Sequence, residues 1–473
     1  MTTGVYRLGG LNVGVNPMLQ EEGQFLQLVN VDSDPVGVKT KRPGIVQYLG
    51  SVDQEIVRGL FNWTRNNGTQ FWNYRYSGSV LYYSTQGTGA WTACGAGTFD
   101  GGTIMGHAVL EDVMIVGDGV NPTKHTSDGT SFGTTASAPI ASYFEEYQNR
   151  IWAGGTASSL FYSTTGTASN WTADSSSISI PGAGKINQVF KLADRLTITK
   201  NSGAIFRYDG NNLVDTATKL GPSSSYSLGQ VEDYRFWLNR LGIFGYGGEA
   251  PQIVSNPIQS YIYNNKGTSI SGEDFDTSPA GVYRYNYYVS VGDIENEFSA
   301  DIVDNAIIVY NYQLNELSAY SFVASRQPRA FLTYKDAGGS DRFVFGDGSG
   351  LCWTFGGTAL YDIETPDDVV IPITAKLEYV WHGKTLLEKK FNYIRLLFNP
   401  GMEGQIQIAV TDTFSEPARN YVTLGQAIDG IVEFHFPSSS RGRFLFVKII
   451  DSSRTSRFVF YGMEIDFDLI NHA

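Results

Sequence analysis

The sequence predicts an all-β chain with a β-propeller of six to eight blades, an extended N-terminal arm and a C-terminal β-sandwich domain. Glycine accounts for 53 of the 473 residues, about 11% against the usual ~7%, and aromatic residues account for 14%. This composition suits short strands that are joined by tight turns. Strand starts also recur about every 40 residues through the middle of the chain. One core rarely serves more than roughly 250–300 residues, so we expect two domains or a repeat with an appendage.

Residues 1–50 are expected to form the arm. Phe25, Leu26, Leu28 and Val29 make an apolar run, which favours an arm packed against the rest of the protein over a flexible tail. Turn-forming pairs divide the arm at Gly9–Gly10, Asn16–Pro17, Asp34–Pro35 and Pro43–Gly44.

A polar turn followed by an apolar strand start recurs through residues 51–362. Five of the six steps between successive starts are 36 to 45 residues long, and the step from Phe236 to Ile307 is 71. A glycine-bearing turn and a second strand follow most of these starts, which is typical of hairpins. The strand starts are Phe71, Val113, Ile151, Leu196, Phe236, Ile307 and Phe343.

Hairpins with this period are typical of a propeller, in which each blade is one small antiparallel sheet. A single blade buries only one face, whereas blades stacked in a ring bury both faces and hide the sheet edges. A β-sandwich or several stacked sheets would also use regular hairpins and stays open as the alternative. The long step after Phe236 could hold a long loop or another blade.

Residues 363–473 lose the hairpin form and alternate between apolar and polar positions, as at Val432, Phe434 and Phe436. Six or more strands in 111 residues predict a compact sandwich. The polar, proline-bearing segment 363–368 marks the expected boundary.

The chain is acidic, with a formal charge of −13 and a pI of about 4.9. Binding to nucleic acid through phosphate neutralisation needs clustered lysine and arginine, so the charge argues against that function and against docking on anionic lipid. The first residues lack the pattern of a secretory signal, and no apolar run reaches the ~18 residues of a membrane helix. We therefore expect no membrane insertion.

No motif for a metal, a cofactor or a catalytic nucleophile is found. The histidines do not stand at metal-ligand spacing, and Cys-x-x-Cys pairs, Walker loops and nucleophile elbows are missing from the sequence. The segment 117–119 resembles half of a calcium loop, and 346–350 is expected to be a hairpin turn. Cys94 and Cys352 could form one disulfide but are expected to be two buried thiols.

Acidic residues near the strand starts raise the question of glycoside hydrolysis. Such enzymes need two carboxyl groups ~5–9 Å apart, which in a propeller would lie near the mouth of the axis. An acidic residue at the same place in each blade is more simply a turn former, so we expect no enzyme. The residues considered are Glu111, Asp112, Glu145, Glu146, Asp194, Glu232 and Asp233.

Two further groups of side chains have a functional and a structural interpretation. Trp63, Tyr74, Tyr82 and Tyr83 could stack on sugars or fill the blade core, and the core is favoured. An arginine group in the C-terminal domain could pair with an acidic neighbouring subunit or be ordinary solvated charge. This candidate subunit interface comprises Arg441, Arg443, Arg454 and Arg457.

The arm also carries sequence elements of a known family. Gly9-Gly10-Leu11-Asn12 is followed by Leu-Val-Asn-Val-Asp at 28–32 and by Gly-Val-Lys-Thr-Lys-Arg-Pro-Gly at 37–44. Together with the hairpin at 308–320 and the order of arm, propeller and sandwich, these elements resemble the tail hub or nozzle proteins (tail tube, DNA-stabilisation proteins) of short-tailed bacteriophages.

The resemblance implies a structural protein of the virion tail that is assembled in the host bacterial cytoplasm. Its copies would form a homo-oligomeric ring, usually a hexamer, below the portal and the adaptor protein, and would hold tail fibres, a needle or a spike. Genomic DNA would pass through the lumen without sequence-specific binding, because acidic or neutral walls let it slide. We expect acidic loops to face that lumen and the arginine-rich C-terminal loops to face other proteins.

Two alternatives to the conduit stay open. One is a phage adhesin, a receptor-binding propeller for host-surface glycan. The other is a propeller glycosidase.

Overall fold

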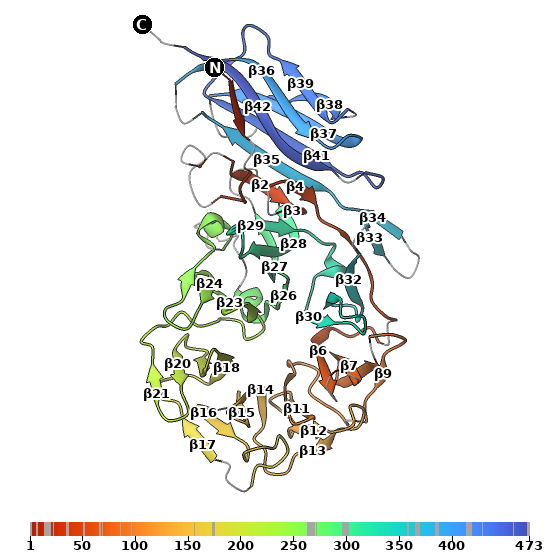
Figure 1. Ribbon diagram of the computed structural model, residues 1–473, viewed down its shortest axis with the longest axis vertical. Coiled ribbons are helices and arrows are strands. Elements are labelled where there is room, and N and C mark those ends of the chain that lie inside the picture. The colour runs from red at the N-terminus through yellow and green to blue at the C-terminus, as the bar shows by residue number, and fades with distance from the viewer. Residues whose placement is uncertain are drawn as a thin grey trace.

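The computed structural model of the chain is an elongated body with a ring of small β-sheets at one end and a two-sheet sandwich at the other (Figure 1). The sandwich projects from the rim of the ring, and both chain termini lie at the sandwich end. The structure describes residues 2–470 except 6–7, 14–19, 22, 35–36, 51–52, 66–67, 69, 86, 96, 156, 173–175, 263–269, 271, 296–301, 357–358, 365–368, 384–386, 413–418, 428 and 457.

The ring contains six separate four-stranded sheets and a seventh unit of four strands that opens into a larger sheet. The first strand of each unit lies nearest the axis and the second strand pairs with it in antiparallel fashion. The first strands are β6 (Val57–Arg65), β10 (Gly106–Leu110), β14 (Ala141–Tyr147), β18 (Ile186–Leu192), β22 (Gly229–Val231), β26 (Ala280–Tyr283) and β30 (Ala330–Lys335). The second strands are β7 (Gln70–Ser77), β11 (Val113–Gly117), β15 (Arg150–Gly155), β19 (Arg195–Lys200), β23 (Tyr234–Asn239), β27 (Asn286–Glu295) and β31 (Asp341–Gly346).

The third and fourth strands complete each unit toward the rim. The third strands are β8 (Val80–Thr85), β12 (Lys124–Thr126), β16 (Ser159–Tyr162), β20 (Ile205–Tyr208), β24 (Gly242–Tyr246), β28 (Ile302–Asn311) and β32 (Cys352–Gly356). The fourth strands are β9 (Thr92–Ala93), β13 (Gly133–Thr134), β17 (Ser176–Ser179), β21 (Leu213–Asp215), β25 (Gln252–Ile253), β29 (Glu316–Tyr320) and β5 (Gly44–Gln47). The predicted propeller of six to eight blades is therefore confirmed.

Apolar clusters fill the space between neighbouring units. Between the units of β14 and β18, for example, Trp152, Leu160, Ile186 and Ile198 pack together. The first strands approach closely at the axis, and a Cβ on Gly106 would lie 2.0 Å from the Ser142 carbonyl oxygen. The ring therefore depends on apolar burial and on small residues where inner backbones meet.

The arm supplies the strand that closes the ring. β5 pairs with β32 as the outermost strand of the last blade, so residues 44–47 and 352–356 meet across the whole propeller sequence. Gly44 fits because its backbone runs against Tyr361, where any Cβ would lie 1.9 Å from the carbonyl oxygen. The predicted packing of the arm is also confirmed, since Phe25, Leu26 and Leu28 are fully buried.

A nine-stranded sheet joins the ring to the sandwich. Its order is β26-β27-β28-β29-β2-β35-β41-β37-β38, so a propeller unit continues through the arm strand β2 (Phe25–Val29) into the C-terminal domain. β2 pairs in parallel with β29 and antiparallel with β35. The C-terminal strands of this sheet are β35 (Ala375–Trp381), β37 (Met402–Thr411), β38 (Val422–Ala427) and β41 (Phe444–Asp451).

The second sheet of the sandwich also mixes arm and C-terminal strands. It is built around the pair β36–β42, and its inner face packs on the nine-stranded sheet through Ile394, Ile465, Leu377 and Ile449. The predicted C-terminal sandwich is confirmed. The strands of this sheet are β1 (Thr2–Val5), β3 (Val31–Ser33), β4 (Lys39–Lys41), β36 (Lys389–Phe398), β39 (Ile431–His435), β40 (Arg441–Gly442) and β42 (Val459–Leu469).

The structure refines three details of the sequence prediction. Ile307 lies in the third strand of its unit, because β27 carries an earlier strand pattern that the spacing passed over. The long step before Ile307 holds two short helices, α1 (Gln259–Ile262) and α2 (Gly272–Thr277), and 3-10 turns occur at Asn256–Ile258 and Ala324–Arg326. The expected boundary falls within a hairpin of β33 (Tyr361–Glu364) and β34 (Val369–Pro372).

Parts of the prediction fall outside the described residues, namely Asn16–Pro17, Pro35 and 365–368. Among the helices of the described chain, none combines the length and apolar character needed to cross a membrane.

Candidate functional site

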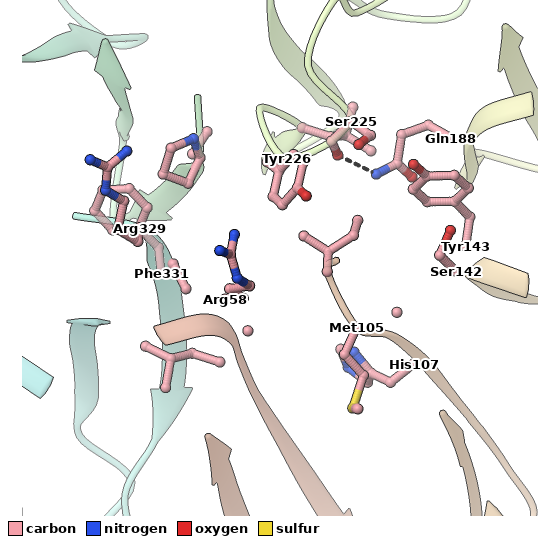
Figure 2. Close-up of a pocket in the computed structure, with 18 of the residues that line it drawn as sticks. Arg58, Met105, His107, Ser142, Tyr143, Gln188, Ser225, Tyr226, Arg329 and Phe331 are labelled. Carbon is pink, nitrogen blue, oxygen red and sulfur yellow. Dashed lines mark hydrogen bonds between the residues drawn. The ribbon is translucent and has the colours of Figure 1, made fainter. Parts of the chain in front are cut away.

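A cavity of about 240 Å³ lies on the ring axis at the point where the first strands begin (Figure 2). We call it the axial cavity. All seven units line it, so its shape depends on closure of the whole ring. Lining residues from successive units are Arg58, His107, Tyr143, Gln188, Tyr226, Ala280 and Arg329.

Two arginines give the axial cavity a positive charge. Arg58 and Arg329 are half-buried, and the described residues that line the cavity include no aspartate, glutamate or lysine. Neither guanidinium has a hydrogen-bond or ion-pair partner among the described residues. His107 adds no charge near neutral pH, because burial lowers its pKa to about 4.

Tyrosine and amide groups complete the polar lining. Arg58 and Tyr226 point toward the centre of the cavity in Figure 2, while Arg329 lies to one side, near Phe331. Burial raises the pKa of Tyr226 to about 12, although the nearby Arg58 charge opposes this, so its hydroxyl is protonated at neutral pH. The Gln188 amide donates to the Ser225 carbonyl oxygen at 2.6 Å and is held in place by it.

None of the seven acidic residues considered for glycoside hydrolysis lines the axial cavity, and five of them lie in turns at the opposite ends of the first strands. Glu111 and Asp112 have φ of 48° and 56°, as the two central residues of a type I′ hairpin turn do. Glu232 takes φ of 51° in the equivalent turn between β22 and β23. Asp194 and Asp233 are exposed second residues of two-residue turns in which only the first residue has a positive φ, so turn formation accounts for all five.

Glu145 and Glu146 lie within β14 itself and point to opposite faces of the strand. Burial raises the pKa of Glu145 to about 7, and the Arg235 charge and the Lys191 backbone oppose this rise. The pair therefore does not face a common cleft, as two catalytic carboxyl groups must.

The two glycine-bearing motifs are turns organised by buried aspartates. Asp118 accepts three backbone N–H groups at 2.7–2.9 Å and the Asn121 amide at 2.7 Å. Burial opposes ionisation of Asp118, but these bonds hold its pKa below the usual range. Asp347 accepts from the Leu351 N–H and the Trp353 ring N–H in the hairpin at 346–350. Within the described residues, no three metal-ligating side chains gather in one place.

The aromatic residues considered for sugar stacking belong mainly to the blade core. Trp63 and Tyr74 are buried in one apolar cluster, and Tyr82 and Tyr83 are half-buried.

Both cysteines are free thiols. Cys352 is buried and Cys94 is half-buried, and burial raises the pKa of each to about 12.

The predicted arginine group is not one cluster. Arg441, in β40, and Arg443 lie just before β41, whereas Arg454 follows its other end, about 26 Å away for an eight-residue strand. All three side chains are exposed, and Arg457 lies outside the described residues. A contact between subunits at these residues stays a prediction.

The arm motif forms a second site of interest, where arm, ring and sandwich meet. Its three cations are buried, and each pairs with a carboxylate from a different part of the chain: β29, the hairpin strand β33 and the end of β41. We call them the junction pairs. They are Lys39–Glu316 at 2.8 Å, Lys41–Asp451 at 3.0 Å and Arg42–Asp362 at 2.8 Å.

Burial shifts the pKa values of three groups of the junction pairs in the direction that favours their uncharged forms, as expected for charged groups in apolar surroundings. It lowers the pKa of Lys39 and of Lys41, and the partner carboxylates oppose this. It raises the pKa of Asp451, which the charge of Lys41 opposes. The two terminal nitrogens of the Arg42 guanidinium donate to the two carboxylate oxygens of Asp362, at 3.0 and 2.8 Å. This paired contact fixes the orientation of the arm relative to β33 as well as the distance between them.

Asn30 extends the junction to the sandwich. Its left-handed backbone, with φ of 57°, turns the chain between β2 and β3. Its side-chain oxygen accepts from Arg42 Nε at 2.9 Å, and its amide donates to Ser321 Oγ at 2.8 Å and to the Thr374 carbonyl at 2.9 Å. One asparagine thereby contacts the arm, the ring and the C-terminal domain.

Sequence reasoning noticed the arm motif only through a family resemblance. Three cations within four residues in an otherwise acidic chain were a local signal that carboxylate partners were needed. Arg58 and Arg329 gave no such signal, because 271 positions separate them and only ring closure places them in one cavity.

Comparison with known proteins finds solved structures of similar shape but assigns the chain to no family. No family model matches the chain, and no curated protein matches it. It is similar to the computationally designed Ika8 protein (11% identity, 66% of this chain and 99% of that one, TM-score 0.37). It is similar to YCF48 from Cyanidioschyzon merolae (10% identity, 66% and 98%, TM-score 0.41) and to BamB from Moraxella catarrhalis (11% identity, 76% and 98%, TM-score 0.36). Similarity this low transfers no function.

Proposed function

We propose that the chain is a structural subunit of a short-tailed bacteriophage tail, of the hub or nozzle class, and acts as a rigid building block without enzymatic activity. The junction pairs carry this proposal, because the arm elements that resemble the family are the ones that tie arm, ring and sandwich together.

The physical role of a conduit subunit is to keep its shape while DNA passes and partners are attached. One sheet of nine strands runs from the propeller into the sandwich, so bending between them would break backbone hydrogen bonds. The junction pairs resist rotation at the same place, because buried ion pairs keep their strength only in one geometry. A two-part body of this kind suits assembly into a fixed ring.

In this proposal six copies form a ring that extends the DNA exit channel below the adaptor protein. Tail fibres, a needle or a spike attach to it, and the genomic DNA passes through without specific binding. Arg441, Arg443 and Arg454 are exposed on the sandwich, where they can pair with acidic surfaces of a neighbouring subunit. Each contact between copies should bury more than roughly 1,000 Å².

Native mass spectrometry and negative-stain imaging of the full chain test the proposal. We expect closed rings, with six copies as the main species. The variant Arg441→Glu/Arg443→Glu should shift the population toward monomers, while Arg195→Glu, which changes an exposed residue at the start of β19, should leave it unchanged. A wild-type chain that stays monomeric at tens of micromolar would overturn the ring.

A second candidate function is the glycan adhesin, which one aromatic groove favours. A cavity of about 480 Å³ between the units of β22 and β26 is lined by Tyr234, Phe236, Tyr310 and Tyr312, with Asn315 beside them. The Tyr234 and Tyr312 rings lie 5.2 Å apart, and Tyr234 is 39% exposed. Exposed aromatic rings beside amides can stack on sugars and hydrogen-bond their hydroxyl groups.

Glycan-array binding separates the two functions. Binding that is lost in Tyr234→Ala/Tyr312→Ala, but kept in the equally exposed Tyr285→Ala, would favour the adhesin. No binding by the wild-type chain would leave the conduit as the single candidate.

A further inference from the structure

The axial cavity has the features of a binding site that the conduit role does not use. It lies on the axis and the sandwich does not cover it, since that domain projects from the rim (Figure 1). Its volume of about 240 Å³ is below the roughly 300–1,000 Å³ of pockets for drug-sized ligands, so an occupant must be small.

The two arginines of the axial cavity differ from two buried arginines of the same blades. Arg75 pairs with Asp53, and Arg326 pairs with Asp347 at 3.2 Å. Arg58 and Arg329 have no such partner among the described residues, although each is half-buried. A positive charge that is partly withdrawn from water without a counter-charge is unfavourable, and a bound anion would remove that cost.

Neutral donors stand beside this charge. The Tyr226 hydroxyl faces the same space as the Arg58 guanidinium (Figure 2), and Ser142 and Tyr143 lie on the β14 side. These groups can donate hydrogen bonds to an oxyanion, and no described carboxylate of the lining would repel it.

We propose that the axial cavity binds a small oxyanion, such as sulfate, phosphate or a small carboxylate, with Arg58 as its main ion-pairing group. Tyr226 donates a hydrogen bond to the same ligand, and Arg329 supplies a second positive charge at the cavity wall. The site is independent of the proposed tail function, because it is built within a single chain.

Isothermal titration calorimetry of the full chain with sodium sulfate, sodium phosphate, glucuronate and neutral glucose tests the proposal. We expect the three anions to bind and glucose not to bind. Arg58→Gln should weaken sulfate binding by about tenfold or more, because a charge-assisted hydrogen bond is lost. Arg329→Gln should weaken it less.

Matched variants separate binding from folding. Arg58→Lys keeps the charge and should recover part of the affinity, while Arg195→Gln removes an exposed arginine elsewhere in the ring and should change nothing. A thermal melt of Arg58→Gln that matches the wild type shows that the ring is intact. Failure of all three anions to bind the wild-type chain, or equal sulfate affinity in Arg58→Gln, would overturn the site.

Discussion

The contacts between neighbouring blades and the junction of ring, arm and sandwich are both buried, but they are made of different side chains. Leu160 and Ile198 belong to an apolar cluster between two blades. At the junction, Lys41 and Asp451 are both fully buried and bonded to each other, and Arg42 is 1% exposed. The first contact recurs around the ring with changing residues, whereas the second occurs once.

The two kinds of contact differ in how strongly their energy depends on orientation. Apolar packing has little dependence on orientation, so many side chains of suitable volume can stack one blade on the next. A buried ion pair offers little net stability over an apolar pair of the same shape, but it strongly penalises any arrangement that separates the charges. The junction joins a propeller to a sandwich. The stacking geometry that repeats between blades cannot set the angle between these two different domains.

The largest effect is expected at Arg42. Arg42→Met leaves Asp362 buried without its partner, which should lower the free energy of unfolding by about 3–5 kcal/mol. Urea denaturation followed by tryptophan fluorescence measures it. Arg395→Met, which removes a half-exposed arginine paired with Glu433 and Glu464, should cost less than about 1 kcal/mol. Equal losses in the two variants would contradict a special role of the junction.

The pair Lys41–Asp451 tests whether the junction needs charge or only shape. Lys41→Met alone should cost about 3 kcal/mol, because the Asp451 carboxylate stays buried and unpaired. The double variant Lys41→Met/Asp451→Leu should recover most of that loss in the same denaturation experiment. A double variant as unstable as the sum of both single variants would show that the pair does not act as a unit.

The blade contact should tolerate changes of shape better than loss of volume. Ile198→Ala should lower the free energy of unfolding by about 2–4 kcal/mol through the cavity it leaves, since Ile198 is fully buried. Ile198→Leu conserves volume and should cost less than about 1.5 kcal/mol. If Leu were as damaging as Ala, blade packing would be as specific as the junction.

The smallest expected effect is the loss of stability at acidic pH through His107. His107 has a folded pKa of about 4, below its usual 6.5, so the unfolded chain gains this proton first as the pH falls. Stability from His107 should therefore be lost between pH 6.5 and about 4. At pH 4.5 the wild type should have lost about 2 kcal/mol more than His107→Phe, relative to pH 7. Parallel pH profiles of the two proteins would contradict a neutral, buried imidazole.

Much of the propeller could be predicted from local patterns. Phe71, Ile151 and Phe343 lie in second strands because each follows a tight turn and starts an apolar run, and both signals are short-range. The turn interpretation of Glu111 and Asp112 needed only residue type and position. Ile307 does not stand at the position of the other strand starts in its blade, because two short helices and the strand β27 lie in the long step before it.

The candidate sites could be predicted only in part. The interface group Arg441 and Arg443 lies far from Arg454 because a strand separates them, which closeness in sequence conceals. The axial cavity depends on Arg58 and Arg329, which sit on blades at opposite ends of the propeller sequence. No local pattern distinguishes an arginine with a carboxylate partner from one without.

The sequence by itself determined that strands alternate with glycine turns, that the repeat forms blades and that a sandwich follows, because these depend on contacts a few residues apart. The tertiary structure alone decided that β5 closes the ring, that β2 joins two domains in one sheet, and which cations are paired. These features depend on pairing between residues hundreds of positions apart, for which many partners are chemically equivalent until the whole chain is packed.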